Sequence, residues 1–451
     1  MKKSIFRGLV LFVVSLVFSC TSLTREPPPQ LDPPSDFPTW AWEGGIYELS
    51  IRNFTPEGTF KAAEAQLDRV KALGIKTLWI MPLYPIGQIE KKGALGSPYS
   101  ISDYQGVNPD FGTLEDFRSL VKTAHGKGLK VIIDLVANHT AWDHPWVKAH
   151  PTWYTQDKNG KIVPPVADWA DVADLNYNNP DLRKEMTNIM VWWVKEMDID
   201  GYRADTGAML PLDFWEESLP TVKAVKDVLL LAESDEPNLI TAGFHMNYAW
   251  PGYSALKKSW SGEAAVFDYA QTALGEWMNT GGAPLLRFIT NHDETSWDNP
   301  PPVIFGGLSG SQAAAVATFL MPGIPLIYQG QELGLDVKED LFGKHTYDWT
   351  QGLATQEFYR NLLSLWKNNK AFQSGALDLQ LSTNESVLSF AREAEGKRFI
   401  VLVNFTPDEQ ALGLPEVWKG RSYTQVSTGE PWDAQEITLP GYGWLILEGT
   451  Y

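Results

Sequence analysis

Strand-like apolar runs alternate with helix-like amphipathic runs over most of the chain. The expected strands cover residues 44–54, 75–83, 130–139, 198–205, 228–233, 243–250, 285–293 and 324–332. Between and after them, apolar residues recur at helical spacing over 60–73, 114–125, 181–197, 212–226, 311–321 and 355–369. Eight alternating units predict an α/β fold, a (β/α)8 TIM barrel, in which the active site lies at the carboxyl ends of the strands.

Two parts of the chain do not follow this alternation. Asp134 and Asp205 are 71 residues apart, whereas Asp205 and Glu233 are only 28 apart, so residues 140–176 form an insertion after the third strand, here called domain B. From 371 to 451 the pattern changes to short alternating runs such as RFIVLVNFT, which predict a C-terminal antiparallel β-sandwich. The barrel is then expected to comprise residues 39–139 and 177–370.

The N-terminus has the layout of a secretory signal. Residues 1–19 combine Lys2, Lys3 and Arg7 with an apolar stretch from Leu9, and VFSC resembles a bacterial lipobox in which Cys20 is lipidated. Residues 20–38 are rich in proline and predict a stiff tether. We expect an exported protein that is lipid-anchored to a bacterial membrane, at the outer membrane or cell surface. A plain signal peptide or an uncleaved anchor is the alternative.

Composition narrows the possible partners. The formal charge of −18 argues against nucleic acid and anionic lipid as the main partner, so we expect membrane contact only through Cys20. Because Cys20 is the only cysteine, the chain has no internal disulfide. The sequence has no phosphate-cradling glycine loop, zinc spacing or GxSxG motif, and no cofactor is implied. The sequence gives no indication of the oligomeric state.

Three strand-like runs end in an acid: Asp205, Glu233 and Asp293. A carboxyl group at the end of a buried strand is costly unless it is paired or used, and the spacing places all three at one end of the barrel. Cleavage of a glycosidic bond needs two carboxyl groups, one of them protonated. A third carboxylate nearby could keep that proton in place and bind sugar hydroxyls. The three acids therefore favour glycoside chemistry.

Neighbouring residues support this interpretation. Arg203 lies two residues before Asp205 on the same strand face, where a guanidinium can keep the carboxylate ionised. His139 and His292 end two other runs and could donate hydrogen bonds to sugar hydroxyls. Taken singly, each histidine could equally be structural.

Five short motifs resemble the alpha-amylase family of glycoside hydrolases, family 13. They are DLVANH (134–139), ADLN (173–176), GYRAD (201–205), LAE (231–233) and FITNHD (288–293), in the family's order. The resemblance implies Asp205 as nucleophile, Glu233 as general acid/base and Asp293 as the acid that binds and distorts the sugar. It also implies a substrate-binding role for Arg203, His139, His292 and Tyr99, with Asp134 supporting Arg203.

The sequence also departs from the family pattern. Many alpha-amylases have a lysine and a histidine three and four residues after the nucleophile, where this chain has Ala208 and Met209. Those residues help to form a calcium site, so no cofactor is required here, although calcium is possible. Asn138 and Asp174 match two family calcium positions. Otherwise Asn138 simply ties domain B to the barrel.

The resemblance implies a retaining hydrolase of alpha-1,4-glucosidic bonds in starch, glycogen or maltooligosaccharides. A transglycosylase or glucosyl isomerase on the same site is the alternative, and a non-catalytic glucan-binding protein is a further one. Aromatic residues of domain B and beyond could stack on sugar faces, although in a chain with 19 tryptophans most must pack in the core. These are Trp142, Trp146, Trp153, Tyr154, Trp169 and Trp250.

Overall fold

The computed structural model of the chain describes residues 32–432 and 436–451. The predicted signal sequence, Cys20 and most of the predicted tether lie outside these residues. Within them, we find no helix that is both long and apolar enough to cross a bilayer.

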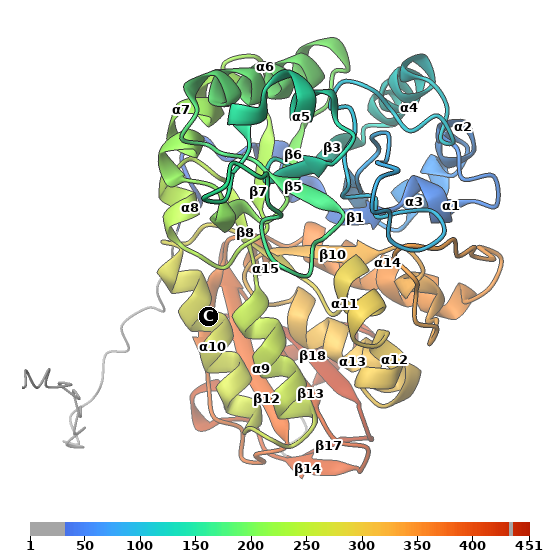
Figure 1. Ribbon diagram of the computed structural model, residues 1–451. Helices are drawn as coiled ribbons and strands as arrows, with labels where there is room; N and C mark the ends of the chain where they lie inside the picture. The colour runs from blue at the N-terminus through green and yellow to red at the C-terminus, as the bar shows by residue number, and fades with distance from the viewer. Residues whose placement is uncertain (1–31, 433–435) are drawn as a thin grey trace, which may run out of the picture.

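Eight parallel strands close into a barrel in the order β1-β10-β9-β8-β7-β6-β3-β2 (Figure 1). This topology confirms the (β/α)8 fold predicted from the sequence. The strands are β1 Gly45–Leu49, β2 Ile75–Ile80, β3 Lys130–Leu135, β6 Gly201–Ala204, β7 Leu229–Ala232, β8 Met246–Tyr248, β9 Leu285–Arg287 and β10 Ile324–Tyr328.

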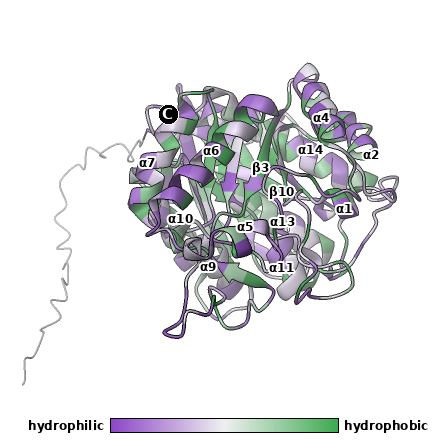
Figure 2. Ribbon diagram, turned by 45° about the horizontal axis from the view of Figure 1, so that its top comes forward, coloured by the Kyte–Doolittle hydropathy of each residue, from purple (hydrophilic) through white to green (hydrophobic). Residues whose placement is uncertain are grey.

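Helices surround the barrel. Figure 2 shows apolar residues on strands such as β3 and polar residues on the outward faces of α4 and α6. The α4 helix begins at a capping box of Thr113 and Asp116, and the Asn179 side chain caps α6. The helices of the barrel are α1 Ile51–Phe54, α2 Phe60–Glu64, α3 Leu67–Ala72, α4 Leu114–Gly126, α6 Pro180–Glu196, α7 Leu212–Lys223, α8 Asn238–Thr241, α9 Trp250–Trp260, α10 Val266–Asn279, α11 His292–Trp297, α12 Pro301–Ile304, α13 Gly307–Phe319, α14 Leu353–Lys367 and α15 Lys370–Gln373.

Several elements differ from the sequence prediction. The run 130–139 is a strand only to Leu135, and His139 begins a separate short strand, β4 His139–Ala141. The run 44–54 is a strand only to Leu49 and then turns into α1, and the helix expected over 60–73 is divided into α2 and α3. The run 285–293 is a strand only to Arg287, and Asp293 lies in the first turn of α11. The Asn291 side chain accepts a hydrogen bond from the Glu294 backbone N–H, so a helix cap redirects the chain just before this acid.

Gly201 shows why glycine precedes the arginine of β6. Its φ of 140° is in the region that favours glycine, and a Cβ atom there would meet the Leu229 carbonyl oxygen at 1.9 Å. Any side chain would therefore push β6 away from β7 and disturb the position of Arg203.

Domain B and the C-terminal domain follow the expected order. In domain B, strands β4 His139–Ala141 and β5 Val172–Asp174 form an antiparallel pair. The short helix α5 Pro145–Ala149 lies between them in the sequence. The C-terminal domain contains a six-stranded sheet in the order β11-β12-β13-β18-β15-β16 and a β14-β17 pair, as a sandwich requires. Its strands are β11 Ala376–Leu379, β12 Val387–Ala394, β13 Lys397–Asn404, β14 Gln410–Leu412, β15 Tyr423–Gln425, β16 Pro431–Trp432, β17 Ile437–Leu439 and β18 Trp444–Thr450.

Aromatic contacts join the C-terminal domain to the barrel. Trp260 lies 4.5 Å from Phe405 and stacks on Tyr442, while Phe372 lies 4.8 Å from Phe399. At the other end of the chain, Phe37 is buried 5.2 Å from Trp42. The predicted tether therefore ends before residue 38, because this aromatic side chain already belongs to the barrel body.

Candidate active site

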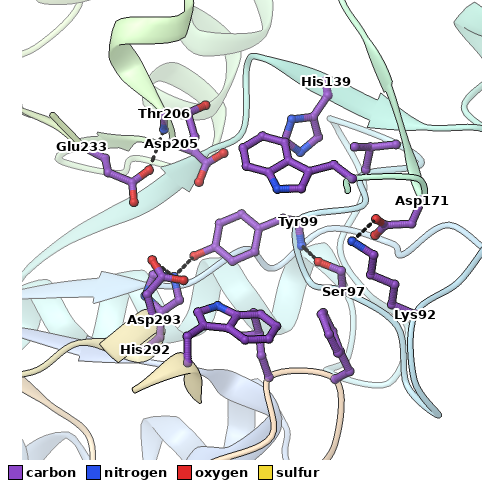
Figure 3. A pocket seen from close by; sticks show the side chains of 15 residues that line it. Lys92, Ser97, Tyr99, His139, Asp171, Asp205, Thr206, Glu233, His292 and Asp293 are labelled. Carbon is purple, nitrogen blue, oxygen red and sulfur yellow. Dashed lines mark hydrogen bonds and ion pairs between the residues drawn. The ribbon is translucent and has the colours of Figure 1, made fainter. Parts of the chain in front are cut away.

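A pocket with a volume of about 190 Å³, partly open to solvent, lies at the carboxyl ends of the barrel strands. It contains the three predicted acids: Asp205 directly follows β6, Glu233 directly follows β7, and Asp293 comes from α11 (Figure 3). The remaining lining residues are Lys92, Ser97, Tyr99, His139, Trp169, Asp171, Val172, Thr206, His292, Trp297, Leu341 and Phe342. The structure thus brings together residues from six loops of the fold.

Arg203 lies beneath this pocket and is fully buried. Its Nη1 atom is 2.7 Å from Asp134 Oδ1 and 2.8 Å from Asp205 Oδ1, and its Nη2 atom is 2.7 Å from Glu233 Oε1. The Asp134 contact follows from strand pairing, since Asp134 and Arg203 are register partners in β3 and β6. One guanidinium therefore holds the predicted nucleophile and the predicted acid side by side.

Glu233 is a carboxyl group suited to hold a proton near neutral pH. Burial raises its pKa to about 8, and the negative charges of Asp205 and Asp293 add to this shift against the opposing effect of Arg203. Its Oε2 atom accepts a hydrogen bond of 2.6 Å from the Thr206 backbone N–H. Thr206 has φ 45°, an unusual value for a β-branched residue, so local strain directs this N–H toward Glu233.

His292 joins the partly exposed Asp293 to a buried acid, Glu48. Its Nδ1 atom contacts Glu48 Oε1, while its Nε2 atom is 2.7 Å from the Tyr99 hydroxyl and 3.3 Å from Asp293 Oδ2. Burial alone would lower the pKa of His292, but Asp293 and Glu48 outweigh it and raise the pKa to about 9. At neutral pH this histidine is a cation that donates from both ring nitrogens.

Tyr99 and His139 form the walls beside the acids. The Tyr99 ring stacks on His292 at 5.5 Å, and its hydroxyl is 3.4 Å from Asp134 Oδ2. Burial lowers the pKa of His139, so its imidazole is neutral at physiological pH, and its ring is 5.5 Å from Trp169. The two histidines, which the sequence does not distinguish, thus differ in charge.

The predicted calcium ligands do not make a calcium site by themselves. Asn138 Nδ2 is 3.3 Å from His139 Nδ1, and Asp174 is the register partner of His139 in the β4-β5 pair. Calcium prefers six to eight oxygen ligands. Among the described residues, no cluster of three or more His, Cys, Asp or Glu side chains is arranged to hold a metal ion. Calcium binding stays a prediction, and no chemical step below depends on it.

Several residues of the site give no clear signal in the sequence. Lys92, Asp171, Trp297 and Phe342 line the pocket but come from non-strand segments without apolar periodicity. Glu48 gives a weak signal, because it is the one acid within the apolar strand β1.

The aromatic candidates also separate in the structure. Trp169 lines the pocket, whereas the others pack against the hydrophobic core. The latter are Trp142, Trp146, Trp153, Tyr154 and Trp250.

Two family models match the chain. The alpha-amylase catalytic domain matches residues 46–161 and 165–373, and the maltogenic amylase C-terminal domain matches residues 379–446. Among solved structures, a noncanonic maltogenic alpha-amylase AmyB from Thermotoga neapolitana superposes with a TM-score of 0.83. It is 28% identical, with 91% of this chain and 99% of that chain covered.

Curated relatives span more than one activity. Alpha-amylase 3 of Dictyoglomus thermophilum is 25% identical, with 91% of this chain and 94% of the relative covered. Alpha-amylase MalA of Haloarcula japonica is 27% identical over 88% of this chain, which spans 60% of the length of that relative. A trehalose synthase of Thermus thermophilus is 26% identical over 91% of this chain, which covers 55% of the relative. With its closed barrel, its C-terminal sandwich and both family models matched in order, the chain belongs to the alpha-amylase family.

Proposed function

We propose that the protein is a retaining glycoside hydrolase that cleaves alpha-1,4-glucosidic bonds in starch, glycogen or maltooligosaccharides. One observation carries this proposal: a single buried guanidinium contacts two neighbouring carboxyl groups, Asp205 and Glu233, of which Glu233 has its pKa raised to about 8. A protonated acid beside a carboxylate held by Arg203 is what double displacement at an anomeric carbon requires.

The roles follow from these protonation states. In the first step, Glu233 gives its proton to the glycosidic oxygen while an Asp205 oxygen bonds to the anomeric carbon, and the leaving sugar departs with that proton. In the second step, Glu233, now ionised, takes a proton from water, and the resulting hydroxide displaces Asp205. Asp293 and the His292 cation are placed to hold the hydroxyls of the reacting sugar.

Transfer to a sugar hydroxyl is the second candidate. The first step is the same, and only the acceptor differs, so the acids cannot decide between the two. The relatives favour keeping this candidate, because they include the trehalose synthase and a maltosyltransferase. The latter is the alpha-1,4-glucan:maltose-1-phosphate maltosyltransferase of Rhodospirillum rubrum, which is 26% identical, with 90% of this chain and 62% of the relative covered. Ala208 and Met209, which stand where many alpha-amylases have a lysine and a histidine after the nucleophile, are both exposed.

Chromatography of early products from maltoheptaose tests the proposal. Short maltooligosaccharides that keep the alpha configuration support retaining hydrolysis, whereas products longer than the substrate show transfer. Beta-configured products would refute retention. Neither cleavage nor transfer would leave only glucan binding.

The cellular setting is part of the proposal. A basic and apolar leader, the lipobox-like VFSC and the proline-rich segment support export and anchoring to a bacterial membrane through lipidated Cys20. A net charge of −18 supports a neutral glucan rather than nucleic acid as partner.

A further inference from the structure

The side of the pocket opposite Glu233 is not used by the mechanism above. Figure 3 shows Lys92, Ser97 and Asp171 beyond Tyr99, while Glu233 lies on the other side of that ring. Lys92 comes from the long segment after β2, and Asp171 comes from domain B just before β5.

An ion pair connects these two segments. Lys92 Nζ is 2.9 Å from Asp171 Oδ1 and donates a hydrogen bond of 3.0 Å to the Asp168 carbonyl oxygen. The Asp171 side chain is only 4% exposed and that of Lys92 is 33% exposed. The Ser100 hydroxyl also donates to the Asp171 carbonyl oxygen at 3.1 Å, which fixes the backbone of this acid.

Aromatic side chains flank the same part of the pocket. Trp169 lies against His139 from the domain B side, and Phe342 lies 5.8 Å from Trp297 on the side of α11. The Trp297 side chain is exposed, although it lines the pocket. Aromatic faces beside a few fixed charges match the two surfaces of a sugar ring, since its C–H faces stack and its hydroxyls need hydrogen-bond partners.

The position of the acid gives the substrate its direction. Because Glu233 protonates the leaving oxygen, the departing sugar lies on its side of the reacting ring. Sugars on the non-reducing side then extend away from Glu233, toward Lys92 and Asp171. At this end of the pocket, the ion pair links the segment after β2 to domain B.

We infer that Lys92 and Asp171 form a terminal subsite that binds the hydroxyls of the non-reducing-end glucosyl residue, so that the enzyme releases short products from that end. The Asp171 carboxylate accepts hydrogen bonds from these hydroxyls and the Lys92 ammonium donates to them. This inference rests on the proposed function, because it assigns a direction and a chain end to the substrate of the same site.

Maltoheptaose whose non-reducing-end 4- and 6-hydroxyls are blocked by an ethylidene acetal tests the inference beside unblocked maltoheptaose. We expect the unblocked chain to yield one short product from the outset and the blocked chain to react at least about 100-fold more slowly, since charge-assisted hydrogen bonds are lost. Equal rates on both chains would overturn the terminal subsite and leave the proposed hydrolysis intact. No reaction with either chain would overturn the proposed function, and this inference with it.

Lys92→Gln and Asp171→Asn separate this binding role from a merely structural one. For maltotriose we expect KM to rise about tenfold, with a smaller effect on kcat, because the lost contacts bind substrate and transition state alike. Lys91→Ala is the matched control, since Lys91 is exposed and lines a different pocket. If Asp171→Asn lowers the melting temperature, Lys92→Gln still decides, and an unchanged KM in that variant would overturn the subsite.

Discussion

Replacing Glu48 with glutamine should lower the pKa of His292 without touching any of the three acids. Glu48 contacts His292 Nδ1 from β1, and both side chains are buried. The other charged groups that face this imidazole are Asp293 on its own helix, Arg203 from β6 and Asp134 from β3. Glutamine keeps the shape of the side chain and removes one of the two carboxylates that raise the pKa of His292.

The size of the effect follows from the pKa of His292. Its rise from 6.5 to about 9 corresponds to ~3 kcal/mol in favour of the charged form. Burial lowers the pKa of His292 in the wild type and in Glu48→Gln alike. Because the variant lacks one of the two carboxylates that oppose this effect, its His292 pKa should be lower by at least about one unit. Because the folded-state pKa is raised, the stability that it contributes is complete below about pH 6.5 and is lost as the pH rises through about 9. The variant should lose much of this pH dependence.

Alpha-glucosyl fluoride provides the kinetic assay. Fluoride leaves without a proton, so kcat/KM for this substrate does not depend on Glu233 as an acid and reports the state of His292 more directly. We expect the alkaline limb of its pH profile to move at least about one pH unit lower in Glu48→Gln. Nitrogen NMR of the histidine rings should show the same shift for His292.

A buried acid nearby supplies the control. Glu339 accepts hydrogen bonds from the hydroxyls of Tyr328 and Tyr347, and lines a separate pocket. Glu339→Gln should therefore leave the alkaline limb close to that of the wild type. An alkaline limb that stays in place in Glu48→Gln, with an unchanged His292 titration, would refute the reasoning.

Four further outcomes are expected. Asp205→Asn should reduce glucan cleavage by at least about a thousandfold in a product assay, because an amide cannot form the glycosyl ester, and retained full activity would contradict its assignment as nucleophile. With maltoheptaose, activity should fall as the pH rises through about 8, where Glu233 loses its proton, and a pH–rate profile that is flat there would contradict the acid role. If calcium binds at Asn138 and Asp174, treatment with a chelator should lower the melting temperature, whereas an unchanged melting temperature and activity would remove calcium from consideration. Cys20→Ser should release the protein from membranes in fractionation, and persistent membrane association would contradict lipidation.

The barrel could be predicted because most of its strands lie in short, largely apolar runs that alternate with helical patterns. β3 and β7, for example, are buried over nearly their whole lengths. The sequence could not show where hydrogen bonding in a ladder stops. Asp293 follows a run that looks like a strand, but the cap formed by Asn291 begins a helix first. Helix caps are local interactions that an apolar pattern does not reveal.

The site could be predicted only in part, for a similar reason. Asp205, Glu233 and Arg203 stand out because charges next to buried strands need a partner. Lys92 and Asp171 do not stand out, since charged residues in loops are usually solvated, and only the folded chain shows that Asp171 is buried against Lys92. Their pairing depends on how domain B lies over the barrel.

The surplus of acids explains why the pKa values of Glu48, Asp134 and Glu233 are all raised. The buried centre holds more carboxyl groups than cations, and they cannot all be ionised in a site with little water. The carboxyl groups are Glu48, Asp134, Asp205, Glu233 and Asp293, and the cations are Arg203 and His292.

Hydrogen bonds help to explain why the pKa of Glu233 is higher than that of Asp134. Burial also raises the pKa of Asp134, to about 7, but hydrogen bonds from Arg203, Trp79 and Tyr99 to its two oxygens stabilise its charged form. Glu233 contacts one nitrogen of the shared Arg203 guanidinium and accepts a hydrogen bond from one backbone N–H. It also faces the negative charges of Asp205 and Asp293, which raise its pKa. The acid role of Glu233 is therefore a property of the whole cluster. Converting either neighbouring acid to its amide should lower the pKa of Glu233, even though neither residue exchanges a proton with it.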